Sequence, residues 1–397
     1  MTSAEALSAD GQAAGLAADH AAGVPAPPIP RYGESTLADL ATSVLDALGV
    51  PGEANPLELP AADRVCLLVV DGLGWNLLRE HPAAAPFLSE LARSGHPLSA
   101  GFPATTVTSL SSLGTGLPPG QHGMLGYQVA VPGTGRLLNA LRWDKRVDPL
   151  TWQPSATIFE RAAAAGVAAY RIAQGSYRDS GLSTAVMRGA IYRGADTLGA
   201  LVGQAATVMA AGPRALAMVY ESGLDSTGHV CGCGSDAWRF QLGHVDRLAE
   251  QLAGALPQGT ALYVTADHGM VDVGPADRID VDAQPGMRAG VTVLGGEPRA
   301  RHVYTRPGAA ADVLAAWREA LSGAAWVASR EEAIADGWFG PVSPAMADRI
   351  GDVVVACTGS RAVVATRTEP RETALTGMHG SLAAADQLVP LLSYRPG

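Results

Sequence analysis

Three segments of this sequence place groups that bind divalent metals directly after a run of apolar residues. They are VCLLVV before Asp71, ALAMVY before Asp225 and His229, and ALYVT before Asp267 and His268. Carboxylate oxygens and imidazole nitrogens are good ligands for zinc and manganese. Two such metals can clamp the attacking and leaving oxygens of a phosphoryl transfer. The three segments together therefore favour metal-assisted phosphoryl chemistry.

Each segment by itself has an ordinary structural explanation. An aspartate after a strand is often only a helix cap or a turn residue, and Asp-His-Gly or Asp-x-x-x-His also occurs without a metal. Chance explains all three in one chain much less well. It is the combination that indicates a site.

A hydroxyl-rich segment, GFPATTVTSLSSLGTG at residues 101–116, adds a possible nucleophile. Its proline and small polar residues predict a turn into a helix, where a hydroxyl such as that of Thr106 would face the positive end of the helix dipole. Held beside a metal, this hydroxyl could ionise and attack phosphorus. The alternative is a Ser/Thr-rich helix cap with no chemistry.

The elements that must position these groups are strands and helices in alternation. Continuous apolar runs at Val65–Val70, Ala215–Tyr220, Ala261–Thr265 and Val353–Cys357 fit strands of a parallel sheet that is buried on both faces. Ser235–Leu256 has an N-cap residue and an apolar stripe, which predict a helix. The pattern predicts an α/β doubly wound fold, in which groups that follow separate strands converge at the carboxyl ends of the sheet.

We expect three parts along the chain. Residues 1–34 are rich in Ala and Pro and predict a flexible leader, with ordered structure from about Ser35. Residues 35–270 and 352–397 would form the catalytic domain. The segment at 271–351 is rich in Gly, Pro and Arg, and we expect a cap or insertion within the same domain.

With these residues in view, the sequence resembles the nucleotide pyrophosphatase/phosphodiesterase branch of the alkaline phosphatase superfamily. That family carries an aromatic-Pro-x-x-Thr segment, a helix ending in Thr-Gly, and then Leu-x-Pro-x-x-His-Gly. The matching positions here are Phe102–Thr106, Thr115–Leu117, Pro119 and His122–Gly123. The resemblance implies an alkaline-phosphatase-like α/β fold with a mostly parallel central sheet flanked by helices and a smaller cap.

Further family motifs extend the resemblance from about Val65 to Ser381. Asp-x-x-Gly-His corresponds to Asp225–His229, Asp-His-Gly-Met to Asp267–Met270, and a last His-Gly to His379–Gly380. The resemblance implies a hydrolase of phosphodiester or nucleotide pyrophosphate bonds. Counting back from Thr115 places its nucleophile on Thr106, with Thr105 as the runner-up.

The resemblance also implies two metal sites. One would be held by Asp225, His229 and His379. The other would be held by Asp71, Asp267 and His268, with the oxygen of Thr106 as a further ligand. The metals are expected to be zinc, with manganese possible. Two dications among three carboxylates leave a charge near +1, which suits a phosphodiester anion. The expected route is in-line attack by Thr106, a phosphothreonine intermediate, and its hydrolysis.

Two departures from the family pattern concern the substrate. An asparagine that contacts a phosphate oxygen in the family aligns with Tyr127, which we expect either to bind substrate or to pack. The Asn-His pair after the nucleophile is replaced by Thr108 and Ser109. A phosphomonoesterase or a phosphonoacetate-type phosphonate hydrolase on the same fold is therefore an alternative. A metal-binding pseudoenzyme is a remote one.

Two other classes of the superfamily fit less well. A sulfatase needs Cys/Ser-x-Pro-x-Arg, and a cofactor-independent mutase needs a serine nucleophile. The sequence offers neither in the required position. The absence of Arg or Lys immediately beside Thr106 favours a diester over a monoester, since monoesterases of this superfamily generally add a cationic group.

Composition limits the partners. A net charge of −10 argues against a nucleic-acid binder that uses a basic face. The start of the chain lacks the pattern of a signal peptide, and no apolar stretch reaches the roughly 18 residues of a membrane helix. We expect a cytoplasmic enzyme with a small phosphate ester or nucleotide substrate, no nucleic-acid partner and no membrane association.

Several other residues keep two interpretations. Cys231 and Cys233 flank a glycine near His229 and could bind a metal, although the site has enough ligands without them. Asp246 could orient a ligand histidine or be exposed. The aromatic rings of Trp143 and Trp152 could stack on a substrate ring, but ordinary packing is the simpler expectation. The same applies to the basic groups of Arg142, Lys145 and Arg146, which could meet a second phosphate or form a solvated face.

Overall fold

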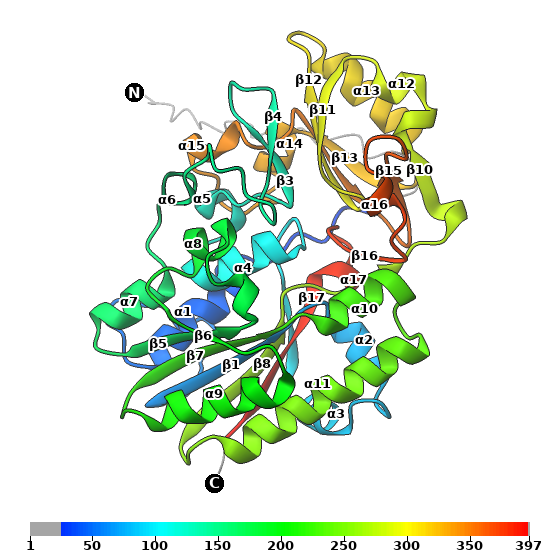
Figure 1. Cartoon of the computed structure of the whole chain (residues 1–397). Helices are drawn as coiled ribbons and strands as arrows, with labels where there is room; N and C mark the ends of the chain where they lie inside the picture. The colour runs from blue at the N-terminus through cyan, green and yellow to red at the C-terminus, as the bar shows by residue number, and fades with distance from the viewer. Residues whose placement is uncertain (1–24, 396–397) are drawn as a thin grey trace, which may run out of the picture.

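The fold is built on two sheets of unequal size. The computed structural model describes residues 25–395. Helices α9 and α11 cross the near face of the larger sheet (Figure 1). The smaller sheet lies above it, at the upper right of the same view. These two helices span Leu198–Ala210 and Asp236–Ala255.

The larger sheet has seven strands in the order β2-β17-β8-β1-β7-β5-β6. Their bounds are β1 Arg64–Val70, β2 His96–Ser99, β5 Ala168–Ala173, β6 Ile191–Gly194, β7 Ala215–Glu221, β8 Thr260–Ala266 and β17 Leu388–Tyr394. Strand β1 pairs in parallel with β7 and β8, and β5 pairs in parallel with β7 and β6. Strand β17 runs antiparallel to both of its neighbours, β2 and β8. The predicted mostly parallel α/β fold is confirmed.

The three central strands explain the apolar runs in the sequence. Every residue of β7 and β8 is buried, as is β1 after its first residue. Burial on both faces removes the period-two alternation that a half-exposed strand would show. Helices must therefore cover both faces of this sheet.

The helices of the main part, which contains the larger sheet, are mostly short. Those in the main part are α1 Leu37–Ala47, α2 Trp75–Glu80, α3 Pro86–Leu91, α4 Thr106–Thr115, α5 Pro119–His122, α6 Pro149–Trp152, α7 Ile158–Ala164, α8 Gly181–Val186, α9, α10 Gly223–Cys231, α11 and α17 Ala384–Gln387. The longest, α11, begins where the sequence predicts. The Ser235 hydroxyl caps it by accepting from the Trp238 amide at 3.2 Å, a contact worth about 1 kcal/mol.

The smaller sheet is antiparallel, in the order β11-β12-β14-β13. Its strands are β11 Val291–Glu297, β12 Ala300–Thr305, β13 Ala325–Ser329 and β14 Val353–Cys357. Around it lie α12 Pro285–Arg288, α13 Ala310–Ala320, α14 Arg330–Ala335, α15 Pro344–Ala347 and α16 Pro370–Thr373. Two-stranded pairs complete the chain: β3 Gln128–Val131 with β4 Arg136–Asn139, β9 Val271–Asp272 with β16 Gly377–Met378, and β10 Arg278–Asp280 with β15 Ala362–Val364.

The placement of β14 corrects one expectation. Val353–Cys357 was expected in the parallel sheet, but it is the antiparallel neighbour of β12 and β13. Val353 and Val355 pack with Trp317 on one face, and Val354 and Ala356 join the main core on the other. Burial on both faces gives the same continuous apolar run in either sheet, so the run could not tell which sheet the strand joins. The division into catalytic domain and insertion otherwise stays a prediction.

The predicted leader lies partly outside the described residues, which begin at residue 25. Its last part contacts the folded chain. The Tyr32 hydroxyl donates to the Trp338 carbonyl at 2.8 Å and accepts from the Phe102 amide at 3.0 Å. This tyrosine thus fixes the last residues of the predicted leader to the loop that leads to α4.

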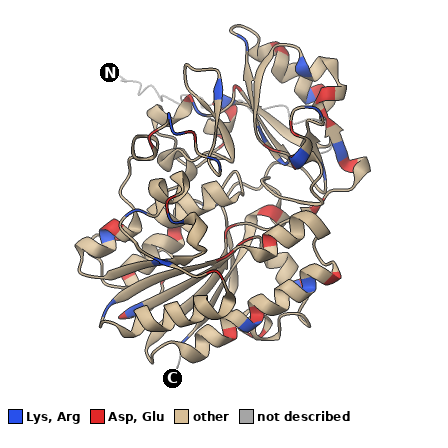
Figure 2. Cartoon of the chain, viewed as in Figure 1, with Lys and Arg blue, Asp and Glu red and all other residues tan. Residues whose placement is uncertain are grey.

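Charge is spread over the surface rather than gathered. In the view of Figure 2, Lys and Arg residues stand among Asp and Glu residues on the helices of both parts. Within residues 25–395, no helix combines the length and the apolar character that crossing a membrane requires.

Candidate active site

The carboxyl ends of three neighbouring strands bring the acidic segments together. The register pairs Val70 at the end of β1 with Glu221 of β7 and with Ala266 of β8. Asp71 and Asp267, which come next, therefore start at the same level of the sheet. The Gly72 amide donates to Oδ1 of Asp267 at 3.1 Å, which joins the two loops directly.

Helix α10 presents the next two groups on one face. Asp225 and His229 are four residues apart, and Nε2 of His229 lies 3.3 Å from Oδ2 of Asp225. Gly72 allows this helix to approach, because a Cβ there would lie 3.1 Å from the Cα of Asp225. Its φ of +75° also favours glycine. The glycine of the Asp-Gly pair thus packs the first acidic loop against α10.

His379 reaches the cluster from the far end of the sequence. Its ring stacks on that of His268, with centroids 3.6 Å apart and planes at 14°. The turn after it needs a glycine, since Gly380 has a φ of +128° and a Cβ there would lie 2.9 Å from Cγ of Glu297. An antiparallel bridge between Ala104 and Gly380 fastens this turn to the loop before α4.

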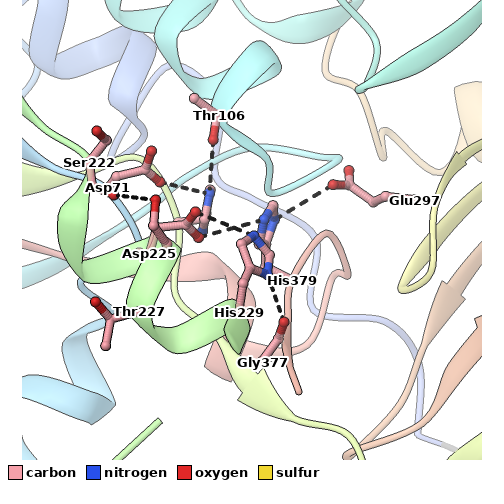
Figure 3. Close-up of polar contacts among 12 residues, drawn as sticks. Asp71, Thr106, Ser222, Asp225, Thr227, His229, Glu297, Gly377 and His379 are labelled. Carbon is pink, nitrogen blue, oxygen red and sulfur yellow. Dashed lines mark hydrogen bonds and ion pairs between the residues drawn. The ribbon is translucent and has the colours of Figure 1, made fainter. Parts of the chain in front are cut away.

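Thr106 is the first residue of α4, and its hydroxyl points into the cluster (Figure 3). Its Oγ1 lies 3.3 Å from Nε2 of His268. Thr105 is the N-cap and is buried, but its side chain makes no capping hydrogen bond. It faces Glu297 instead. Of the two candidate hydroxyls, only that of Thr106 contacts a histidine of the cluster.

The three histidines share one hydrogen-bonding arrangement. Their Nδ1 atoms contact backbone carbonyls: His229 that of Gly377 at 2.7 Å, His268 that of Gly269 at 3.0 Å, and His379 that of Ala104 at 3.0 Å. A carbonyl can only accept, so each Nδ1 must carry the proton. In the neutral ring, Nε2 then has a free lone pair. All three are in the tautomer that a metal ligand needs.

Each of the three aspartates has one buried carboxylate oxygen that lacks a hydrogen-bond partner. Oδ1 of Asp71, Oδ1 of Asp225 and Oδ2 of Asp267 are buried and make no hydrogen bond. Burial, and after it the neighbouring carboxylates, raise the pKa of all three, to about 7 for Asp225 and for Asp267. Buried anions with free oxygens are costly unless a positive charge accompanies them. This donor set fits divalent cations.

The pKa values of two of the histidines shift in opposite directions. Burial by itself would lower the pKa of His268, but the carboxylates of Asp267 and Asp71 raise it well above its usual range. Burial and the nearby His268 ring lower the pKa of His379 well below that range. His268 is thus the imidazole most deeply surrounded by negative charge.

Two groups of side chains have ligand atoms close enough to share one ion. The first is Asp225, His229 and His379, as the sequence predicts. The second is Asp71, Asp225 and His268, in which Asp225 takes the place expected for Asp267. Oδ1 of Asp267 already accepts from two backbone amides. Among the described residues, neither group includes Cys231 or Cys233.

A cavity of about 480 Å³ opens beside the cluster. Asp71, Thr106, His379 and Tyr127 lie in its wall. The Tyr127 hydroxyl donates to Oε1 of Glu372 at 3.3 Å, so this tyrosine faces the cavity without touching the metal-ligand groups. Its role in binding substrate stays a prediction.

Glu297 is a site residue that the sequence did not reveal. It ends β11 of the smaller sheet and lines the cavity, with Oε2 at 3.6 Å from Nδ1 of His379. Burial raises its pKa to about 8. Nothing in the local sequence, GGEPR, resembles a ligand motif. Only the packing of the smaller sheet against the His379 turn brings this carboxylate to the site.

Other candidates of the sequence lie elsewhere. Asp246 accepts from the amides of Phe87 and Leu88 and so caps α3, which neither of its two expected roles anticipated. Trp143 and Trp152 are not in the cavity wall. The Trp143 indole donates to the Val147 carbonyl at 2.7 Å, as packing would require. Of the three basic residues, only Arg142 lines the cavity.

Comparisons with known proteins identify the family and the fold. A model of the type I phosphodiesterase / nucleotide pyrophosphatase family matches residues 65–382. The fold is similar to that of murine ectonucleotide pyrophosphatase / phosphodiesterase 5, solved as an inactive variant in complex with AMP, with a TM-score of 0.66 and 18% identity over 84% of this chain and 88% of that one. The human counterpart gives 0.65 and 18% over the same shares. No curated protein sequence matches.

Proposed function

Because the chain belongs to the type I phosphodiesterase / nucleotide pyrophosphatase family, and is a hydrolase of that kind, we propose that it cleaves a small nucleotide substrate through Thr106. The single observation that carries this proposal is the position of the Thr106 hydroxyl, 3.3 Å from Nε2 of His268 at the rim where the acidic loops meet. The AMP bound to the murine relative supports a nucleotide as the substrate class.

Two divalent cations would be held by this set of ligands. We assign the first to Asp225, His229 and His379. We assign the second to Asp71, His268 and the free Oδ2 of Asp267, with Asp225, which is also within reach of Asp71 and His268, as a further ligand. Zinc is the first choice, since the histidines offer Nε2 lone pairs, and manganese is the second. When bound, such cations supply Lewis acidity that offsets charge on the attacking and leaving oxygens.

The protein's own contribution to the reaction is to position Thr106. As the first residue of α4, it sits where backbone amides have no helical partner and the helix dipole is positive. A phosphate at this end would be oriented by those amides. The Thr106 hydroxyl loses its proton to solvent as Oγ1 attacks phosphorus, and the bond from phosphorus to the leaving oxygen breaks. A water then attacks the phosphorus of the phosphothreonine, the bond from phosphorus to Oγ1 breaks, Oγ1 regains a proton, and the phosphate product leaves.

Substrate discrimination distinguishes this function from its rivals. We expect kcat/KM for bis-p-nitrophenyl phosphate or a nucleotide pyrophosphate to exceed that for p-nitrophenyl phosphate and for a phosphonate. A monoester preference of about 100-fold, or roughly 2.7 kcal/mol of transition-state discrimination, would instead favour the phosphomonoesterase. Turnover of phosphonoacetate alone would favour the phosphonate hydrolase.

The decisive experiment compares two neighbouring threonines. Thr106→Ala should abolish turnover of bis-p-nitrophenyl phosphate and leave the metal content unchanged. Thr105→Ala is the matched control and should keep most of the activity. Loss of activity in Thr105→Ala but not in Thr106→Ala would transfer the role of nucleophile to Thr105. A wild-type protein that binds two metals and hydrolyses none of these esters would be a binding protein.

A further inference from the structure

A buried arginine in the cavity wall has no role in the reaction described above. Arg171 lies in β5, where it pairs in register with Met218 of β7 and Tyr192 of β6. Its residue is only 4% exposed, yet it lines the cavity together with Asp71 and Thr106. Its Cζ lies 4.7 Å from the ring centroid of Tyr220.

Two other buried arginines, Arg299 and Arg301, show what Arg171 lacks. Arg299 forms a bidentate pair with Asp386, both contacts being 2.8 Å, and Arg301 pairs with Glu369 at 2.7 Å. Among the described residues, Arg171 takes part in no such ion pair, and its Nη1 is buried without a hydrogen-bond partner. A buried guanidinium is costly to leave unpaired, so an anion from outside the chain would stabilise it.

The surroundings of Arg171 are suited to such an anion. The Tyr220 hydroxyl donates to Oδ2 of Asp71, so one aromatic ring separates the guanidinium from a proposed metal ligand. The Tyr177 and Ser222 hydroxyls lie 3.2 Å apart, and both line the cavity. Hydroxyl donors and a cation in the wall of one cavity can together bind a second negative group of the substrate, in addition to the one at the proposed metal ligands.

We propose that Arg171 is a specificity-determining residue that binds a second phosphate of the substrate, so that the cavity prefers nucleoside polyphosphates and dinucleotides to simple phosphodiesters. This inference rests on the proposed function. The planar guanidinium offers two parallel N–H donors that match phosphate oxygens. Arg142 and Arg371 also line the cavity, but both are exposed, and solvent weakens their attraction for an anion.

The experiment uses two substrates that share one nucleoside. The p-nitrophenyl ester of thymidine 5′-monophosphate carries one phosphate, and thymidine 5′-triphosphate carries additional ones. In Arg171→Gln we expect kcat/KM for the triphosphate to fall about tenfold or more, mainly through KM, because a hydrogen bond to a charged group is lost. The value for the ester should change by less than about threefold.

Arg178→Gln is the matched control. Arg178 also lies over a tyrosine ring, that of Tyr192 at 4.9 Å, but it is not in the cavity wall, and both substrates should be unaffected. Arg171→Lys keeps the charge without the planar fork and should show a smaller loss, confined to the triphosphate. If Arg171→Gln does not fold, this lysine variant decides the question.

Three results would overturn the inference: equal losses on both substrates, no loss on either, or a wild-type enzyme that hydrolyses the ester but not the triphosphate. Each of them leaves the proposed function standing, because turnover of the ester is retained in the wild type. Failure of the wild type to hydrolyse either substrate would contradict the proposed function itself.

Discussion

The rings of His268 and His379 lie face to face, 3.6 Å apart, although one follows β8 and the other follows β16. Each ring keeps its Nδ1 on a backbone carbonyl. Their Nε2 atoms are therefore directed toward different carboxylates: that of His268 lies 3.3 Å from Asp71, and that of His379 lies 3.9 Å from Asp225. The stacked pair thus forms the boundary between the two proposed metal sites.

Asp225 is the residue whose loss should affect both metals, because it belongs to both groups of possible ligands. We expect Asp225→Asn to contain less than one equivalent of zinc and to lose nearly all turnover of bis-p-nitrophenyl phosphate. Zinc content after dialysis, measured by plasma mass spectrometry, checks this. Asp246→Asn is the control, since this buried aspartate only caps α3. Two equivalents of zinc in Asp225→Asn would refute the assignment.

Removal of metal should also lower stability. A ligand that binds only the folded state stabilises it by about 4 kcal/mol at a thousandfold excess over its Kd. We therefore expect a chelator to lower Tm and abolish activity, and added zinc to restore both. In Asp225→Asn, neither reagent should shift Tm appreciably. An unchanged Tm of the wild type in chelator would count against the sites.

Two histidines outside the site should make stability fall in acid. Nδ1 of His122 accepts from the Met124 amide, and Nδ1 of His302 accepts from the Gly351 amide, both at 3.0 Å. Protonation would break these bonds. Burial lowers the pKa of His122 to about 3 and that of His302 to about 4, below the usual 6.5. Between those values only the unfolded chain takes up the protons.

The free energy of unfolding should therefore be intact above about pH 6.5 and decrease as the pH falls toward 4, by about 1 to 3 kcal/mol for each histidine. Urea denaturation at a series of pH values, in chelator so that metal binding does not contribute, measures this. His302→Gln should flatten the slope even if it lowers stability at neutral pH. Identical slopes in the variant and the wild type would exclude His302 as a cause.

Glu297 should support the site from the smaller sheet. Its carboxylate lies 3.6 Å from Nδ1 of His379, and groups that contact a ligand in this way typically change metal affinity by about 10- to 100-fold. We expect Glu297→Ala to weaken zinc binding by about tenfold. Glu372→Ala, which alters the same cavity beside Tyr127, should raise KM and leave zinc affinity unchanged. Competition with a chromogenic chelator distinguishes the two variants.

The sequence by itself determined the parts of this protein that depend on local order. Continuous apolar runs predicted β1, β7 and β8, and the residues that follow them, Asp71, Asp225 and Asp267, meet at one edge because parallel strands end there. The start of α4 at Thr106 was also predictable from its turn and hydroxyl residues.

Only the tertiary structure decided which distant segments meet. Strand β14 joined the smaller sheet, Asp246 capped α3, and Glu297 and Arg171 entered the cavity wall. None of these follows from spacing or periodicity, because an apolar run specifies burial but not its partner strand. A lone charged residue likewise carries no local pattern. Its role depends on the groups that long-range packing places beside it, and these can be read only in three dimensions.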